Sequence, residues 1–148
     1  MDTRFAIAIH LLILITESET PMSSAQMAES VGTNPSFVRK ILGALKHAGI
    51  IDSRRGATGF TLSVPASKIT LLWVYEAIYE TSKVALFCMH KNPNDECLVG
   101  RYIKPTLDEV FGKVESDARA RMEKTTLAEC IGDMRSLIEC DSDTAHRA

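Results

Sequence analysis

The chain has 148 residues, of which 45% are hydrophobic and 24% are charged, as in an ordinary globular protein. This length allows one domain with an extension, or two small units. The formal net charge is −2, and no run of about 18 apolar residues would span a membrane as a helix. No nucleophile–base constellation, metal motif or phosphate-binding loop stands out, so we do not expect an enzyme.

The N-terminal segment from Phe5 to Ile15 is apolar except for His10. It lacks the basic start and the small-residue cleavage site of a signal peptide, so we predict a buried helix over residues 3–17 and a cytoplasmic protein. One face of this helix should contact the rest of the domain and the other a partner subunit. His10 is then expected in the core or in that interface. Four cysteines without paired spacing argue against a disulfide framework.

Residues 23–47 have the pattern of two short helices joined by a tight turn. Ser23 and Gln26 can form a capping box, and Gly32 tolerates the left-handed backbone that ends a helix. Asn34 can cap the second helix, and Pro35 fits its first position. A helix over residues 35–47 places a set of apolar residues on one side at i, i+3, i+4, i+7 spacing: Val38, Ile41, Leu42, Leu45 and Ala48.

The opposite side of this second helix is polar and basic, with Ser36, Arg39, Lys40, Gly43 and His47. A glycine in a helix interior costs about 1 kcal/mol relative to alanine. Close approach of a phosphate strand would explain Gly43, and plain tolerance of a glycine would explain it equally well. After Gly49, the β-prone runs 50–54 and 60–63 flank a loop with two glycines and predict a β-hairpin.

Positive charge is concentrated in this region. The segment from Asn34 to Arg55 contains five Lys or Arg and one Asp, a charge of +4, which leaves −6 for the rest of the chain. A local basic patch on an otherwise acidic chain favours phosphate contact. Two helices at a tight turn, the second with a basic outer face, form the helix-turn-helix arrangement that enters the major groove of DNA. The alternative is a winged-helix module that binds protein and carries the basic face only as a solvated surface.

The middle of the chain is less regular. Thr70 can cap a helix that ends near Glu80, and residues 81–98 have no clear period. This irregular segment contains Cys88, His90 and Cys97. These residues could bind an iron–sulfur cluster or a metal, could sense redox conditions through thiols, or could have no sensory role, with Cys88 as a small buried hydrophobe.

A long helix is predicted from Val99 to about Lys124, kinked or begun afresh at Pro105. It carries one apolar stripe: Ile103, Leu107, Val110, Val114, Ala118 and Met122. A single stripe on a projecting helix usually packs against its own copy, so we expect a homodimer, with recognition helices about 34 Å apart on DNA. A capping box from Thr126 to Glu129 opens a last short helix that ends at Ile138.

The expected fold is mainly α with a small β-hairpin wing. Residues 1–82 should form a winged helix-turn-helix DNA-binding domain, and 83–98 a loop that could act as a sensor segment. Residues 99–138 should form the dimerisation helix and the C-terminal helix, and 139–148 a disordered tail.

Several stretches carry a resemblance to a known family. The run Asn34-Pro35-x2-Val38-Arg39-Lys40-Ile41-Leu42, followed by Ala48-Gly49-Ile50-Ile51 and by Arg54-Arg55-Gly56, resembles the Rrf-two (Rrf2) family of bacterial winged-helix repressors. Members of that family regulate iron–sulfur cluster, nitric oxide and cysteine responses. The resemblance covers about residues 1–138. The Asn-Pro start of the second helix and the Asn-Pro-Asn loop are most similar to the YwnA-like branch, which lacks a recognised cluster.

The resemblance implies a homodimer with crossed long helices on an operator near a promoter. It implies phosphate contacts from the start of the first short helix, groove contacts from the second helix, and further contacts from the wing. The residues concerned are Ser24, Asn34, Pro35, Ser36, Phe37, Arg39, Lys40, Lys46, Arg54, Arg55 and Thr58. Cluster-binding members have three closely spaced cysteines before the long helix. This chain has two, widely spaced, so we expect no iron–sulfur cofactor.

Overall fold

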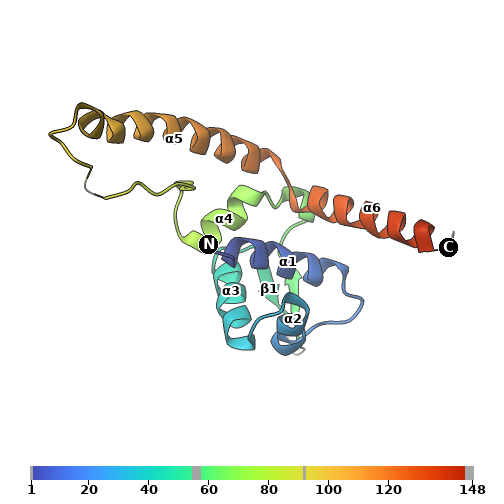
Figure 1. Ribbon diagram of the computed structural model, residues 1–148. Coiled ribbons are helices and arrows are strands. Elements are labelled where there is room, and N and C mark those ends of the chain that lie inside the picture. The colour runs from blue at the N-terminus through green and yellow to red at the C-terminus, as the bar shows by residue number, and fades with distance from the viewer. Residues whose placement is uncertain (1, 55–57, 92, 146–148) are drawn as a thin grey trace.

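The structure is a computed structural model that describes residues 2–54, 58–91 and 93–145. The elements run in the order α1 (Arg4–Glu17), α2 (Ser24–Val31), α3 (Pro35–His47), β1 (Ile51–Ser53), β2 (Phe60–Leu62), a 3-10 turn η1 (Ala66–Lys68), α4 (Leu71–Tyr79), α5 (Leu98–Lys124) and α6 (Leu127–Ala145). Helices α1 to α4 and the strands form a body from which α5 and α6 extend in opposite directions (Figure 1). None of the described helices is long and apolar enough to cross a membrane.

The two short helices form where their capping residues predict them. The Ser23 hydroxyl accepts the Gln26 backbone N–H, and the Gln26 side chain accepts the Ser23 N–H in return. Gly32 ends α2 in the left-handed conformation at φ 73°. Asn34 Oδ1 then accepts the Phe37 N–H at 2.9 Å. The predicted capping box, turn and helix over residues 35–47 are therefore confirmed.

The wing is a two-stranded antiparallel sheet in which Ile51 pairs with Leu62 and Ser53 with Phe60. The predicted hairpin is confirmed, although Arg55, Gly56 and Ala57 at its tip lie outside the described residues. Gly59 directly precedes the return strand and has φ 108°, and a Cβ on it would lie 2.7 Å from Pro21 Cβ. Only glycine fits this position without movement of the neighbouring chain.

One hydrophobic core holds the body together. The fully buried side chains include Leu11 and Leu12 of α1, Met27 of α2, and Leu42 and Leu45 of α3. Burying each such side chain contributes about 1.5–3 kcal/mol relative to exposure. Most apolar residues of α1 pack on this core, but His10 is exposed. The prediction of a core position for His10 is therefore wrong, and an interface position stays a prediction.

An isolated antiparallel bridge between Thr70 and Thr126 joins the body to the C-terminal helices. The Leu71 N–H donates to Thr125 O at 2.9 Å, and the Leu127 N–H donates to Ile69 O at 2.8 Å. Ile69 and Leu127 are both fully buried beneath this bridge. Thr126 and Glu129 form the predicted capping box of α6. The break between α5 and α6 is thus fixed to the start of α4.

The long helix is continuous from Leu98 to Lys124, so it does not start afresh at Pro105. Its 27 residues correspond to about 40 Å. Helix α6 continues to Ala145, well beyond the predicted end at Ile138. Residues 139–145 contain neither glycine nor proline, so nothing local stops the helix. The expected disorder of residues 139–145 is wrong, and residues 146–148 lie outside the described part.

The apolar stripe of α5 is divided between two environments. Ala118 and Met122 pack against a small cluster of Leu72, Tyr75 and Val84 in the same chain. Val110 and Val114, farther from the body, are 48% and 44% exposed. The part of the stripe that can pair with another copy is therefore the part farther from α6, including Ile103 and Leu107.

Candidate nucleic-acid interface

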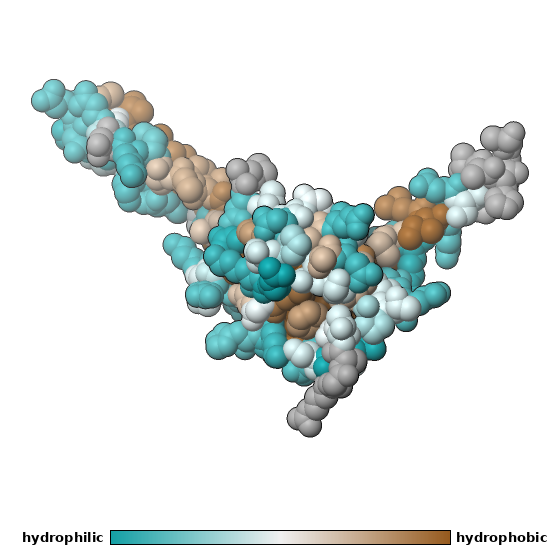
Figure 2. All heavy atoms as spheres, turned by 90° about the horizontal axis from the view of Figure 1, so that it is seen from below, coloured by the Kyte–Doolittle hydropathy of each residue, from teal (hydrophilic) through white to brown (hydrophobic). Residues whose placement is uncertain are grey.

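The outer face of α3 is exposed and cationic. Arg39, Lys40 and Lys46 all lie on the surface, opposite the side that is buried in the core. Figure 2 views the molecule from below the body of Figure 1, where hydrophilic residues surround a smaller hydrophobic group, and both arms carry hydrophobic residues among hydrophilic ones. A solvated cationic helix face at one end of the molecule can approach an anionic partner without first moving other elements.

Arg39 connects the two helices of the pair. Its guanidinium donates to the Ser24 hydroxyl at 3.3 Å and to the Ser36 hydroxyl at 3.0 Å. No carboxylate in the described part of the chain pairs with it. The hydroxyls hold the side chain in place and leave its charge uncompensated, which suits contact with a phosphate or a guanine edge.

Lys46 makes the equivalent connection to the wing. Its ammonium group donates to the Ser53 hydroxyl of β1 at 2.7 Å. Asp52, the one acid between Asn34 and Arg55, instead accepts a hydrogen bond from Ser63 at 3.0 Å. Lys46 therefore keeps its positive charge beside the wing with only a neutral partner.

Together these contacts enclose a groove of about 510 Å³ between the start of α2, the outer face of α3 and the wing. Gly43 lies on its floor, and a Cβ there would meet nothing within 4 Å. Packing inside the chain therefore does not demand this glycine, and both explanations of it stay open. The polar residues that line the groove are Ser23, Ser24, Arg39, Lys46, Ser53 and Thr58.

The predicted contact residues do not all lie in this groove. Asn34 uses its side chain to cap α3, and Phe37 is half-buried against the core. Lys40 lines a different hollow, between α3 and α4. Ser53 was not predicted, because it comes beside Lys46 through the packing of β1 against α3. Arg54 is exposed, and Arg55 lies outside the described residues. The DNA contacts themselves stay predictions.

The candidate sensor residues are dispersed. Cys88, His90 and Cys97 are exposed, so the expectation of a buried Cys88 is wrong. Within the described part of one chain, no three His, Cys, Asp or Glu side chains come together in a group that could hold a metal ion. Among the described residues of one chain, these donors are therefore not grouped as the roughly four ligands of an iron–sulfur cluster would be.

The thiols differ in their surroundings. Cys97 precedes the first residue of α5, and the backbone N–H groups of Gly100 and Val99 lower its pKa. Burial is the main cause that raises the pKa of the Cys130 thiol, and the carboxylates of Asp133 and Glu129 raise it further. Cys97 is thus the better candidate of these two for thiolate chemistry.

Comparisons with known proteins agree with this geometry. The Rrf2 family model, described as an iron-dependent transcriptional regulator, matches residues 1–133. YwnA of Bacillus subtilis (strain 168), named as a transcriptional regulator of the helix-turn-helix type, is 37% identical over 134 residues, which cover 90% of this chain and 98% of YwnA.

Two solved structures extend the comparison to the fold. A crystal structure described as that of a DNA-binding protein is 36% identical, with a TM-score of 0.66 over 86% of this chain and 98% of that one. CymR of B. subtilis, described as the global cysteine regulator, is 16% identical and shares the fold, with a TM-score of 0.65 over 89% of this chain and 95% of that one. The winged helix-turn-helix, the basic groove and the family match lead to one conclusion: this chain belongs to the Rrf2 family of transcriptional regulators.

Proposed function

We propose that two copies of this chain bind a two-fold symmetric DNA operator and repress transcription from it. The observation that carries the proposal is the groove in which Arg39 is tied to α2 and Lys46 to the wing through neutral hydroxyls. Helix α3 thus presents two uncompensated cations on one surface, each held by a hydroxyl of a neighbouring element. Such a surface suits a duplex, whose charges lie on two phosphate strands beside the groove that α3 would enter.

The two cations have different roles in this proposal. Arg39 lies toward the start of α3, the part of a recognition helix that contacts base edges, and a bidentate guanine contact is worth about 1–3 kcal/mol of discrimination. Lys46 lies in the last turn of α3 beside the wing, where a phosphate strand would pass in this proposal. A phosphate contact adds affinity for every sequence alike.

The second copy supplies the other half of the operator contact. Val110 and Val114 are the exposed centre of the α5 stripe, and pairing two such stripes would cover them. The pair would place its two α3 helices about 34 Å apart on one face of the duplex. Because the partner is chromosomal DNA, we place the protein in the cytoplasm.

The test uses the intact protein and a pool of random 30-base-pair duplexes, from which bound sequences are selected through repeated rounds. Fluorescence anisotropy on the selected duplex and on a scrambled one then compares the parent protein with three variants. We expect Arg39→Ala to bring the two affinities together, since it removes about 1–3 kcal/mol of base discrimination. Lys46→Ala should weaken binding to both duplexes and lower the salt slope by about one. Lys91→Ala, on an exposed loop residue, is the matched control.

Two outcomes would contradict the proposal. If no preferred sequence is selected from the pool, the proposed recognition of a specific operator is wrong. Binding to duplex DNA that is insensitive to salt would favour the protein-interaction module, because phosphate contact releases counterions. Identical behaviour of the Arg39 and Lys46 variants would overturn the division between base and phosphate contacts.

We also propose that this chain binds DNA without an iron–sulfur cluster. The support is the dispersal of Cys88, His90 and Cys97 over an exposed segment. Protein purified without oxygen should be colourless and should still bind the selected duplex. Charge-transfer absorbance that disappears together with DNA binding would contradict this.

A further inference from the structure

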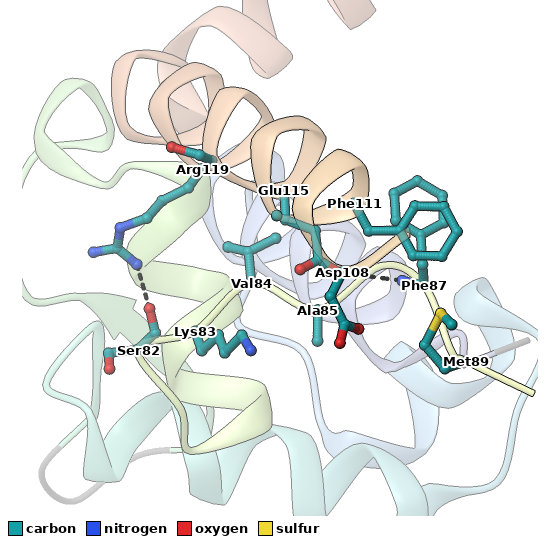
Figure 3. Close-up of a pocket in the computed structure, with 12 residues that line it drawn as sticks. Ser82, Lys83, Val84, Ala85, Phe87, Met89, Asp108, Phe111, Glu115 and Arg119 are labelled. Carbon is teal, nitrogen blue, oxygen red and sulfur yellow. Dashed lines mark hydrogen bonds between the residues drawn. The ribbon is translucent and has the colours of Figure 1, made fainter. Parts of the chain in front are cut away.

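Two arginines of this chain have hydrogen-bond partners on another element, and the partners differ in charge. Figure 3 shows Arg119 of α5 donating to the carbonyl of Ser82, and the same guanidinium pairs with the Glu76 carboxylate of α4 at 2.9 Å. A carboxylate holds an arginine in place and also compensates its charge. Arg119 therefore serves to join α5 to α4 and to the segment that follows α4.

Arg39 of α3 has two serine hydroxyls as partners. Its Nη1 donates to Ser24 Oγ at 3.3 Å, and its Nη2 donates to Ser36 Oγ at 3.0 Å. Among the described residues, none of the ion pairs includes Arg39, and no Asp or Glu lines the groove around it. The two hydroxyls thus hold this guanidinium without compensating its charge.

The two hydroxyls come from different helices. Ser36 lies three residues before Arg39 on the same face of α3, the spacing at which helical side chains meet. Ser24 is the first residue of α2, 15 positions earlier in the chain. A guanidinium tied at one nitrogen can still turn about that bond. Ties at both terminal nitrogens, to two helices packed on each other, fix its plane as well as its position.

The tied guanidinium keeps enough donors to read a base. An arginine side chain has five N–H groups in a rigid fork, and the serines accept from two of those of Arg39. A bidentate contact to guanine O6 and N7 needs two more. Arg39 can therefore keep both serine partners while it contacts a base edge.

We propose that Ser24 and Ser36 are positioning residues, which determine the base edge that Arg39 reads and so part of the operator sequence. The inference rests on the DNA binding proposed above, and it gives these hydroxyls a role that acts through Arg39. An untied arginine loses rotamer freedom when it binds a base and can turn to a phosphate instead. A tied one has lost that freedom before DNA arrives.

Both serines can be replaced without removing a helix cap. Ser23 caps α2 and Asn34 caps α3, whereas Ser24 and Ser36 are the first and second residues inside these helices. Alanine is the best helix former at such positions. Serine to alanine also changes no charge, so the salt dependence of DNA binding should stay that of the parent protein.

The experiment takes the duplex selected by the intact parent protein and changes its base pairs one at a time. Fluorescence anisotropy with Arg39→Ala identifies the base pair at which the preference disappears. We expect Ser36→Ala to reduce the preference at that same base pair by roughly three- to tenfold, the cost of immobilising one flexible side chain, and to keep it elsewhere. Ser24→Ala should have a smaller effect at the same base pair, because its bond to Arg39 is longer.

Three further variants serve as controls. Ser36→Thr keeps a hydroxyl and should restore the preference. Ser30→Ala changes an exposed serine of α2 outside the groove and should leave every affinity unchanged. Adding Ser36→Ala to Arg39→Ala should weaken binding to neither the selected nor the scrambled duplex any further.

NMR of the free protein tests the tie without DNA. Relaxation of the ¹⁵N nucleus of Arg39 Nε should show restricted motion in the parent protein and faster motion when Ser24 and Ser36 are both replaced by alanine. Fast motion of Arg39 in the parent protein would overturn the positioning role, whatever the DNA result.

The outcomes separate the positioning role from the proposed function. If no sequence is selected although Arg39 is rigid, operator recognition is wrong, and the role of the serines in it is wrong too. A preference that Arg39→Ala removes and both serine variants keep would overturn the positioning role alone. Loss of preference at a different base pair in Ser36→Ala, or an equal loss on all duplexes, would show that Ser36 contacts DNA itself and does not act through Arg39.

Discussion

Two glycines on either side of the basic groove have opposite backbone requirements. Gly59, just before β2, has a φ of 108° and has Pro21 in the space where a side chain would lie. Gly43, in the middle of α3, has an ordinary helical backbone and open surroundings. The fold therefore requires glycine at position 59, whereas it would accept another residue at position 43, where a functional reason for glycine stays open.

Substitution of each by alanine should therefore change stability in opposite directions. Gly59→Ala should lower the free energy of unfolding by about 1–3 kcal/mol, because it combines backbone strain with a steric conflict. Gly43→Ala should raise it by up to about 1 kcal/mol. Urea denaturation measures both, and a Gly59→Ala protein as stable as the parent would contradict the close contact with Pro21. Fluorescence anisotropy then measures the affinity of the Gly43→Ala protein for DNA. A weaker affinity would indicate close approach of a phosphate strand, and an unchanged affinity would indicate plain tolerance of a glycine.

Thiol reactivity should also vary from residue to residue. Since the N–H groups of Gly100 and Val99 lower the pKa of Cys97, its thiolate should form below the ordinary pKa of about 8.5. Burial should hold Cys130 in the thiol form to higher pH. Iodoacetamide should thus alkylate Cys97 faster than Cys130 at pH 7, as measured by mass spectrometry of digests. In urea the two rates should converge; equal rates in the folded protein would contradict the difference.

At the scale of elements, the sequence could predict those helices whose ends and buried faces are marked by neighbouring residues. The helix over residues 35–47 has a cap, a proline at its first position and one continuous apolar face, and the structure has the same bounds. The end of α6 was missed because residues 139–145 contain polar side chains but no stop. The attachment of residues 82–87 to α5 was not predictable, since Glu115 and Arg119 reach partners there that are 28 to 37 positions away in the chain.

The Glu17–Arg135 ion pair, which joins α1 to α6 at 2.8 Å, gives a pH-dependent prediction. Hydrogen bonding to Arg135 is the main cause that lowers the pKa of Glu17 in the folded chain. The pair therefore stabilises the fold above the unfolded Glu pKa of about 4.3, and this contribution is lost as pH falls through the lower folded value. Arg135→Gln should be slightly less stable than the parent at pH 7, where solvent screens the pair, and this difference should shrink as the pH falls toward 3.

Urea midpoints at several pH values measure that difference. Arg121→Gln is the control, because it removes an exposed arginine of a different helix, α5. Its urea midpoint should follow that of the parent at every pH. A gap between Arg135→Gln and the parent that stays constant down to pH 3 would show that the ion pair is not its source.

At the scale of the whole molecule, the main expectation left to test is that the α5 helices of two copies pair. Val110→Glu or Val114→Glu would place a charge in the proposed α5 pairing, so either should convert dimers to monomers without loss of helix content. Ser116→Glu, on another face of α5, is the matched control and should stay dimeric. Sedimentation velocity at micromolar concentration measures the change. A parent protein that sediments as a monomer would contradict pairing outright.

The bridge between Thr70 and Thr126 has a consequence for which promoters this protein could recognise. It sets the direction in which α5 leaves the body, so in a paired molecule it would set the distance from one α3 to the other. One base pair added between operator half-sites moves the second half-site by about 3.4 Å along the axis and rotates it about the duplex. A few buried residues at this junction, far from any base, would then decide which half-site spacings are tolerated.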